Sequence, residues 1–202
     1  MNTNSCDSFM DISPRQLEII ESTGKLLLAG GIYNLTTKNL ANEMRFSEAA
    51  LYRHFKSKDE IITMMLKHLS LNMDKRLREV LNNESNSIEK LSATFESQFH
   101  FFNTNKHFLV AIFSDGLWEK NENIHNAVKG VMAVKRKYLD TILTQGIENN
   151  EFTLKVDKAS LIHISMATFR LHMLKWKMNN YDFDVEEGGK KIIGDLLLLI
   201  KK

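Results

Sequence analysis

The segment from Ser47 to Lys58 contains the side chains of this chain that are best suited to bind phosphate and DNA bases. It combines hydroxyl, basic and small side chains within about three turns of a helix. Basic and hydroxyl groups contact the DNA backbone, and a helix with small side chains can approach base edges in the major groove. The segment therefore predicts DNA binding, with Tyr52, Arg53 and His54 directed toward the backbone.

Two short helices would position these side chains. Ser47 can cap a helix that begins directly after it, and Thr36 can cap a helix over residues 37–44, where apolar residues recur every three or four positions. Leu51 and Phe55, four residues apart, would face inward and fix the second helix to its support. Two short helices joined by a tight turn form a helix-turn-helix arrangement, whose second helix enters the major groove.

Neighbouring helices would support the motif. A helix over residues 14–29 is expected, because Ser13 can cap it and the glycine pair at residues 30–31 would end it. After the motif, Ser57 and Glu60 form a predicted capping box, which starts the next helix and aims its first amides at a phosphate.

The stretch from Arg15 to Ile62 resembles the N-terminal domain of the TetR family of transcriptional regulators. The Ser-x-x-x-Leu-Tyr-x-His-Phe-x-Ser-Lys pattern of that family is present as Ser47, Leu51, Tyr52, His54, Phe55, Ser57 and Lys58, preceded at the family's spacing by Gly31, Thr36, Leu40 and Ala41. The chain departs from the family at Arg45-Phe46, where Gly-Val is usual, and at Ile32, where an aromatic residue is usual. Because Arg45 lacks the conformational freedom of glycine, the resemblance does not define the backbone of this turn.

The motif and the resemblance together predict which residues contact DNA. Glu48 is unusual among them, since it repels phosphate, although it can accept a hydrogen bond from cytosine. The predicted DNA-contacting residues are Thr36, Thr37, Ser47, Glu48, Ala49, Tyr52, Arg53, His54 and Lys58.

The basic charge of the chain lies where the motif needs it. The net charge is only +2 over 202 residues, which argues against a general polyanion binder. Between residues 37 and 58, however, five basic residues stand against two acidic ones, a local excess of +3. DNA binding would therefore depend on this segment and not on the overall charge.

The rest of the chain is expected to be helical. Only one proline occurs, and apolar residues recur with helical spacing over residues 57–82, 87–102, 106–118, 124–147, 157–178 and from 185 to the end. The predicted fold is all-α, with an N-terminal three-helix helix-turn-helix domain at residues 13–58. A larger helical ligand-binding and dimerisation domain would follow at residues 59–202.

The last two helices are expected to pair with a second copy of the chain. A helix that is apolar on several faces needs a partner subunit as well as its own core. The TetR resemblance also implies a homodimer, whose recognition helices meet major-groove faces about 34 Å apart. A monomer with a wide core is the alternative. The predicted interface residues are Ile162, Met166, Met173, Trp176, Ile193, Leu196, Leu197 and Ile200.

Aromatic residues of the middle helices suggest a ligand pocket, although ordinary core packing would produce the same stripe. The resemblance implies that an effector binds in this domain and changes the spacing of the two DNA-binding domains. A cavity rich in phenylalanine would suit a small apolar or aromatic effector. Arg170 could anchor an acidic group of that effector or pair with a nearby acidic residue. The predicted pocket residues are Phe95, Phe99, Phe102, Phe113, Trp118, Tyr138, Phe169 and Arg170.

The sequence predicts no metal site, no cofactor and no membrane span. The histidines are scattered, and the single cysteine, Cys6, cannot form a disulfide within the chain. The N-terminus lacks the apolar run of a signal peptide, and no stretch approaches the about 18 apolar residues of a membrane helix. The expected location is the cytoplasm.

Three functions follow from these features. The favoured one is a transcriptional regulator, usually a repressor in the TetR family, that leaves its operator when a small molecule binds. The segment from Ser47 to Phe55 is also similar to that of a nucleoid-occlusion protein of the TetR type, so a DNA-bound dimer that acts through a protein partner is an alternative. An enzyme is the weakest interpretation, because no phosphate loop, nucleophile motif or catalytic carboxylate pair is evident.

Overall fold

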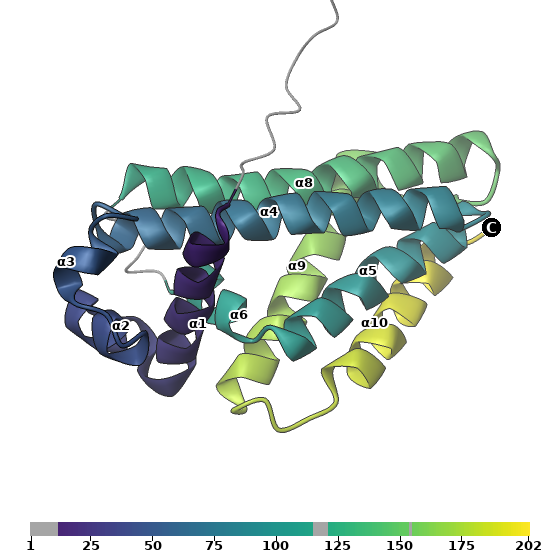
Figure 1. Ribbon diagram of the computed structural model, residues 1–202. Coiled ribbons are helices and arrows are strands. Elements are labelled where there is room, and N and C mark those ends of the chain that lie inside the picture. Colours follow the sequence, from purple (N-terminus) through teal and green to yellow (C-terminus); the bar gives the residue numbers. More distant parts are fainter. Residues whose placement is uncertain (1–11, 115–120, 154) are drawn as a thin grey trace, which may run out of the picture.

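The computed structural model describes residues 12–114, 121–153 and 155–202, so Cys6 and Trp118 lie outside the described residues. Throughout this part the chain is helical and contains no strand, which confirms the predicted all-α fold (Figure 1). No helix in these ranges is long and apolar enough to cross a membrane. The helices are α1 (Pro14–Asn34), α2 (Thr37–Glu43), α3 (Glu48–Leu51), α4 (Lys58–Asn83), α5 (Ser87–Thr104), α6 (His107–Ile112), α8 (Glu122–Glu148), α9 (Lys158–Met178) and α10 (Val185–Ile200).

Hydroxyl side chains start the first four helices, as the sequence predicts. The hydroxyl of Ser13 accepts a hydrogen bond from the backbone N–H of Gln16 at 3.2 Å, and the Gln16 side chain accepts one from the N–H of Ser13 at 3.1 Å. Thr36, Ser47 and Ser57 each accept a hydrogen bond from the N–H three residues later, at 3.1–3.2 Å. Each cap satisfies an amide that the helix itself leaves free.

Two local features differ from the sequence prediction. The carboxylate of Glu60 accepts from the N–H of Lys56 at 2.5 Å, one residue before the position that a full capping box requires. The first helix does not end at Ala29, because it bends at Gly30 and Gly31 and continues to Asn34. Gly31 has φ of 64°, a conformation that glycine adopts without a steric penalty.

Arg45 adopts the left-handed conformation that a glycine would favour in the turn between α2 and α3. Its φ is 56°, and the N–H of the next residue, Phe46, donates to the carbonyl of Ala41 at 2.8 Å. The guanidinium of Arg15 lies 4.8 Å from the centre of the Phe46 ring. The turn therefore keeps a tight shape with arginine, at a strain cost on the order of 1–2 kcal/mol.

A small core holds the three N-terminal helices to the start of α4. Leu51 and Phe55 face inward, as their spacing predicts, and are 1 % and 3 % exposed. The buried members of this small core are Ile19, Leu40, Leu51, Phe55 and Ile61. Ile62, the next residue of α4, belongs to the larger core of the rest of the chain. Two cores thus share a single continuous helix.

The larger domain is built around α4 and α8, which run side by side along its length (Figure 1). Helix α5 packs against α4, α8 and α10, and α9 packs against α8 and α10. The short α6 lies between α1 and this bundle, in contact with both α1 and α4.

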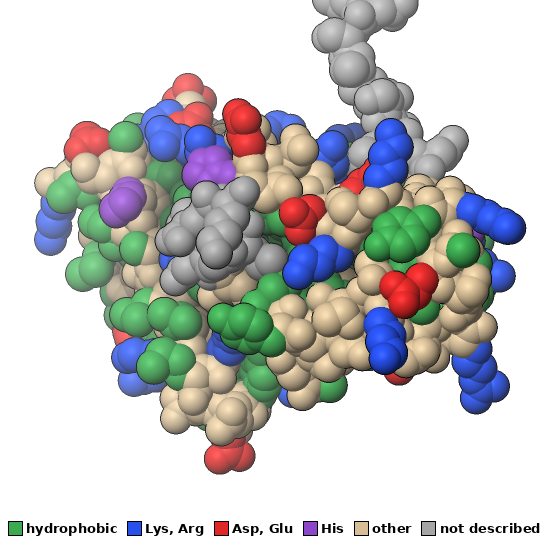
Figure 2. All heavy atoms as spheres, turned by 90° about the vertical axis from the view of Figure 1, so that its left-hand side faces the viewer, with side chains coloured by type: hydrophobic (Ala, Val, Ile, Leu, Met, Phe, Trp, Pro, Cys, Tyr) green, Lys and Arg blue, Asp and Glu red, His purple; other side chains and the backbone are tan. Residues whose placement is uncertain are grey.

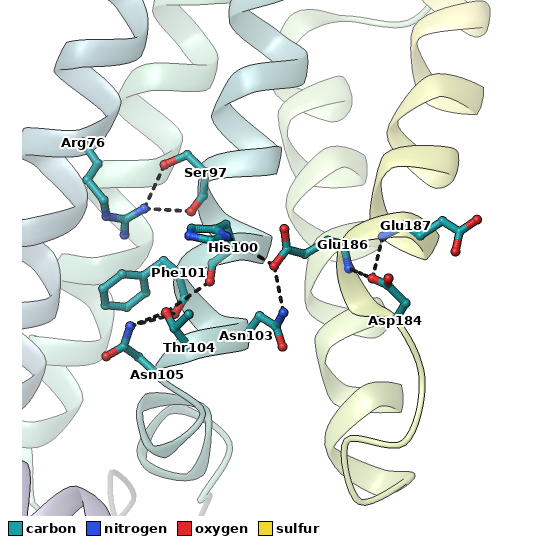
Figure 3. A network of polar contacts seen from close by, with 10 residues as sticks. All are labelled: Arg76, Ser97, His100, Phe101, Asn103, Thr104, Asn105, Asp184, Glu186 and Glu187. Atoms are coloured by element: carbon teal, nitrogen blue, oxygen red, sulfur yellow. Dashed lines mark hydrogen bonds and ion pairs between the residues drawn. The ribbon is translucent and has the colours of Figure 1, made fainter.

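Polar contacts hold α5 between α4 and α10 (Figure 3). Arg76 on α4 donates from Nη1 to the backbone oxygen and the hydroxyl of Ser97, both at 3.0 Å, and its guanidinium lies 4.2 Å from the centre of the Phe101 ring. On the other side of α5, the amide of Asn103 donates to the carboxylate of Glu186 on α10 at 2.8 Å. Helix α5 is therefore fixed on both flanks.

The residues predicted to form the dimer interface are instead packed inside their own chain. Met166 is partly buried, and the others are 0–9 % exposed: Ile162, Met173, Trp176, Ile193, Leu196, Leu197 and Ile200. Only a small part of these side chains is therefore exposed to a partner. The large apolar side chains left exposed on the same two helices are Ile164, Leu171, Met178, Leu198 and Leu199. Sequence periodicity identified the apolar helices but not which of their faces the chain itself covers.

Candidate DNA-binding surface and effector cavity

The residues predicted to contact DNA gather at one end of the molecule, on α2, α3 and the start of α4. Thr37 is half-buried, and the other predicted residues are exposed: Thr36, Ser47, Glu48, Ala49, Tyr52, Arg53, His54 and Lys58. The structure thus brings the predicted set together and leaves most of it accessible to a large ligand.

Helix α3 is shorter than the segment that suggested it. It ends at Leu51, and Tyr52, Arg53 and His54 follow in a tight turn. Backbone N–H groups of these three residues donate to carbonyls of the preceding turn at 3.0–3.3 Å. The three side chains are therefore presented from a fixed turn beside the helix.

Thr37 and Glu48 connect the starts of α2 and α3. The hydroxyl of Thr37 donates to Oε2 of Glu48 at 2.9 Å. This bond gives the carboxylate a partner within the protein and orients α3 against α2.

Figure 2 looks onto this end of the molecule. Lys and Arg side chains stand out from it, with acidic side chains between them. One acidic residue, Glu43, already pairs with Lys25, with the charged atoms 3.6 Å apart. Because the charge is mixed, binding to DNA must rely on the placement of individual side chains.

A cavity of about 460 Å³ lies in the larger domain, within the range of about 300–1,000 Å³ that small-molecule sites occupy. Helices α4, α5, α6, α8 and α9 all contribute to its wall. The lining residues are Met73, Gln98, Phe102, Leu109, Ile112, Phe113, Lys129, Val131, Met132, Ala133, Lys135, Arg136, Ile162, His163, Met166, Ala167, Phe169 and Arg170.

Only part of the predicted pocket lines this cavity, namely Phe102, Phe113, Phe169 and Arg170. Phe95 and Phe99 pack behind Phe169, with ring centres 6.0 and 5.2 Å from its ring. Tyr138 lies elsewhere, because its hydroxyl donates to the backbone oxygen of Asp74 at 2.9 Å and joins α8 to α4. Aromatic character alone therefore did not distinguish cavity wall from core.

Two polar residues of the wall, Lys135 on α8 and Gln98 on α5, are not among the residues predicted from the sequence. A signal was present, because Lys135 falls between Val131 and Tyr138 at a position where the helical repeat requires an apolar side chain. A polar residue within an apolar stripe is a candidate for a ligand contact, and it is this kind of interruption that would have identified both residues.

Lys135 and Gln98 are buried without polar partners. Lys135 is 5 % exposed, and its Nζ has no hydrogen-bond partner within the described part of the chain. This nitrogen lies 2.9 Å from the centre of the Phe169 ring and 4.9 Å from that of Phe95. Burial lowers the pKa of the Lys135 amine well below its usual value. Gln98 is fully buried, and neither polar atom of its amide has a described partner.

The charged residues at the exposed edge of the cavity are basic, and they lie among the exposed apolar residues Met132, Ala133 and Ala167. Lys129, Arg136, His163 and Arg170 are exposed, and the lining contains no aspartate or glutamate. The guanidinium of Arg170 lies 4.8 Å from the centre of the Phe113 ring and forms no ion pair within the described residues. The edge of the cavity therefore favours an anion over a cation.

Two contacts connect the cavity wall to the N-terminal domain. His107 begins α6, and its ring lies so close to Gly24 of α1 that a Cβ there would come within 2.8 Å of it. Burial lowers the pKa of His107 to about 4, so this ring is neutral near pH 7. Asn121 begins α8, and its amide donates to the carboxylate of Asp59 at the start of α4 at 2.9 Å.

Comparisons with known proteins match both parts of the chain. Residues 19–64 match the family described as bacterial regulatory proteins, tetR family. Residues 66–200 match the family described as the C-terminal region of YsiA-like proteins.

Individual relatives share this organisation. The fatty acid metabolism regulator protein of Bacillus subtilis is 20 % identical over 172 residues, which cover 85 % of this chain and 88 % of the relative. The nucleoid occlusion factor SlmA of Shewanella baltica is 24 % identical over 161 residues, which cover 78 % of this chain and 82 % of the relative.

Solved structures show the same fold. The transcriptional regulator FadR of Bacillus subtilis, in complex with stearoyl-CoA, is similar with a TM-score of 0.80 at 17 % identity, over 91 % of this chain and 98 % of that one. FadR of Bacillus halodurans is similar with a TM-score of 0.82 at 16 % identity, over 92 % and 95 % of the two chains. With a helix-turn-helix at one end and family matches over both of its parts, this chain belongs to the TetR family of bacterial transcriptional regulators.

Proposed function

We propose that this regulator is a dimeric cytoplasmic repressor that leaves its operator when an apolar carboxylic acid, or the thioester of such an acid, fills the cavity of the larger domain. Each subunit would place α3 in the major groove of a near-palindromic site. Tyr52, Arg53, His54 and Lys58 would contact phosphates, and Glu48 and Ala49 would lie nearest the base edges.

The composition of the cavity carries the effector part of this proposal. Its wall is apolar and aromatic, which suits a hydrocarbon chain, whereas the charged residues at its exposed edge are basic and its lining contains no acidic residue. A molecule with an apolar body and an anionic end satisfies both properties, because it buries its chain and pairs its charge.

Relatives support an acyl group as the apolar body. One solved neighbour, FadR of Bacillus subtilis, holds stearoyl-CoA, and one sequence relative is named a fatty acid metabolism regulator. Both are at most 20 % identical to this chain, so they support the class of ligand and not its chain length.

A protein partner in place of an effector is the second candidate. The similarity to SlmA, a nucleoid occlusion factor, favours it. The cavity favours the effector instead, because a partner that docks on the outer surface gives no reason for an internal wall with unpartnered polar groups.

The contacts between the cavity wall and the N-terminal domain supply a route for release. A ligand that displaces α6 would act on α1 through His107 and Gly24, and one that displaces α8 would act on α4 through Asn121 and Asp59. Either displacement changes the spacing of the two DNA-binding domains, so that the ligand-bound dimer no longer fits two successive major grooves.

Operator release tests the proposal. A fluorescent duplex selected from the host genome is bound to the dimer, and anisotropy is followed while dodecanoic acid or dodecanoyl-CoA is added. We expect at least one of these ligands to weaken operator binding by roughly tenfold, a coupling of about 1.4 kcal/mol.

The Ala133→Trp variant provides the control. Ala133 lies in the cavity wall, away from the DNA-binding end, so a tryptophan there would fill ligand space without changing DNA contacts. We expect this variant to bind the operator normally and to resist release. If neither ligand changes operator affinity in the unaltered protein, the proposed effector class is incorrect.

A further inference from the structure

Lys135 occupies a position that its neighbours on α8 mark as core. Val131 precedes it by four residues and Tyr138 follows by three, and both are buried. The Lys135 amine rests against the faces of two phenylalanine rings and has no hydrogen-bond partner within the described residues. A buried amine in contact only with aromatic rings is a donor without an acceptor.

Gln98 belongs to the same end of the cavity. It lies three residues after Phe95 and four before Phe102 on α5, on the face of the helix that these two residues share. Both rings pack against Phe169, with ring centres 6.0 and 6.1 Å from it, and the Lys135 amine lies over that same Phe169 ring. Two unpartnered polar side chains from different helices thus line the same cavity, and the aromatic neighbours of Gln98 on α5 pack against the ring that the Lys135 amine contacts.

Two buried polar side chains without partners are unfavourable unless a ligand forms hydrogen bonds with them. Buried polar groups in proteins almost always have partners, and leaving two of them unsatisfied costs stability. Both side chains line the cavity, so a ligand inside it can reach them. The Lys135 amine and the Gln98 amide N–H both need an acceptor, and the Gln98 carbonyl oxygen can itself accept from the Lys135 amine or from a ligand.

The geometry points to an inner site in which Lys135 and Gln98 bind the carboxylate of an apolar acid, so that the effector is the free acid and not its thioester. This inference rests on the proposed function and specifies its ligand. A carboxylate has two acceptor oxygens for the two donors, and hydrogen bonds to an ionised group are roughly twice as strong as those between neutral groups. The aromatic and aliphatic wall would then bury the rest of the acid.

Binding of a free acid at this site requires a proton. The acid is ionised near pH 8, since carboxyl groups titrate at about pH 4, whereas burial lowers the pKa of the Lys135 amine and so disfavours its charged form in the empty cavity. In the complex the amine and the carboxyl group share one proton, whichever atom holds it. The protein–acid complex must therefore take up one proton from the solvent, and an alcohol or a thioester takes up none.

Other titratable groups at the cavity are few. Lys129 and Arg136 from α8 and His163 and Arg170 from α9 line it, and within the described residues α4, α5 and α6 contribute none to the wall. His163 has an imidazole ring that could bind a proton in place of Lys135. A His163→Gln variant therefore separates the two.

Isothermal titration calorimetry of the full-length dimer measures proton uptake. Dodecanoic acid, dodecan-1-ol and dodecanoyl-CoA are titrated near pH 8 in two buffers that differ in ionisation enthalpy, and the difference in heat gives the number of protons bound per ligand. We expect about one proton for the acid and none for the other two ligands. The acid should bind roughly tenfold or more tightly than the alcohol, as a charge-assisted hydrogen bond requires.

Variants assign the proton to one side chain. Lys135→Met should abolish the uptake and weaken acid binding by roughly tenfold, with alcohol binding changed by less than about threefold. Gln98→Leu should weaken acid binding and keep the uptake. His163→Gln and Lys129→Met, which remove other groups of the same wall, should leave the proton uptake unchanged.

The outcomes separate this inference from the proposed function. If the acid binds without proton uptake, if Lys135→Met retains the uptake, or if the thioester binds more tightly than the acid, the inner carboxylate site is refuted, although the cavity remains an acyl site. If the alcohol, the acid and the thioester all fail to bind, the proposed function fails with it.

Discussion

The buried amine of Lys135 lowers the stability of the folded protein, and it is also available to bind a ligand. Its amine is held among phenylalanine rings, where an apolar side chain of similar length would pack without leaving an unsatisfied donor. The stability of the empty protein should therefore improve when this amine is removed. That expectation does not depend on which ligand binds.

The Lys135→Met variant should be more stable than the unaltered protein near pH 7 by about 1–3 kcal/mol, the cost of a buried donor without a partner. Burial lowers the pKa of this amine in the folded protein, so the unfolded chain binds a proton that the folded chain does not. Folded stability then rises with pH up to the unfolded pKa of about 10.4. The advantage of the variant should accordingly shrink as the pH rises toward the unfolded pKa of about 10.4.

Urea unfolding at several pH values measures this difference. Lys129→Met, at an exposed position of the same helix, is the matched control and should change stability little at any pH. A difference between Lys135→Met and the unaltered protein that stays constant with pH would show that the amine is charged in the folded state.

At the residue scale, the features that could be predicted are those that depend only on residues close together in the sequence. Ser13, Thr36, Ser47 and Ser57 could be predicted as helix caps because a hydroxyl three residues before a free amide satisfies it in almost any fold. The inward position of Lys135 could not be predicted in this way. It depends on which helices surround α8, and these are far away in the sequence.

Among the elements, α6 links the cavity to the N-terminal domain. It contributes to the cavity wall and also contacts α1 of the N-terminal domain. The contact is close because Gly24 has no side chain, which lets the His107 ring lie directly on the helix backbone. Because the two helices are in close contact here, a displacement of α6 would also move α1.

Gly24→Ala tests how tight this contact is. Alanine favours a helix over glycine by about 0.5–1 kcal/mol, but its Cβ would lie 2.8 Å from the His107 ring, and overpacking costs about 1–3 kcal/mol. We expect the clash to outweigh the helix propensity and to destabilise the protein by roughly 1–2 kcal/mol in urea unfolding.

Gly130→Ala is the matched control for this substitution. Gly130 also lies within a helix, α8, but an added Cβ would meet only the Ser70 hydroxyl at 4.0 Å. This variant should gain about 0.5–1 kcal/mol. Equal stabilisation of both variants would mean that α6 moves easily to accommodate the added Cβ. In that case a displacement of α6 would have little effect on α1.

Helix positions were largely predictable, and helix ends were not always so. The long amphipathic helices α4, α5, α8, α9 and α10 begin and end within about two residues of their predicted bounds. Of the helix expected over residues 106–118, the described part ends at Ile112, and residues 115–118 lie outside the described residues. Periodicity continues past a helix end when the following residues pack on the same core, as partly buried Phe113 does.

The exposed apolar residues of α9 and α10 bear on the whole molecule. Ile164, Leu171 and Met178 recur at intervals of seven on α9 and are 43–74 % exposed, and Leu198 and Leu199 are 77 % and 66 % exposed on α10. A seven-residue repeat of exposed apolar side chains is suited to pairing with another helix. We therefore assign the proposed dimer contact to this face.

Leu171→Glu should weaken dimer formation by roughly tenfold or more, because it buries a charge at the centre of an apolar contact. Light scattering after size-exclusion chromatography, over a dilution series, measures the effect. Leu71→Glu, a similarly exposed leucine on α4, is the control and should remain dimeric. An unaltered protein that is monomeric throughout the series would contradict the assignment.

The unbroken helix α4 constrains how hybrid regulators can be engineered from this protein. Adjacent residues, Ile61 and Ile62, serve different cores, so no linker exists at which one half can be exchanged for that of another regulator. If the junction were placed before α4, the transferred N-terminal domain would lose Ile61 from the core that it shares with Leu51 and Phe55. Its helices would then pack against an α4 from another protein. A usable junction has to fall within α4, and the donor must bring its own counterpart of Ile61.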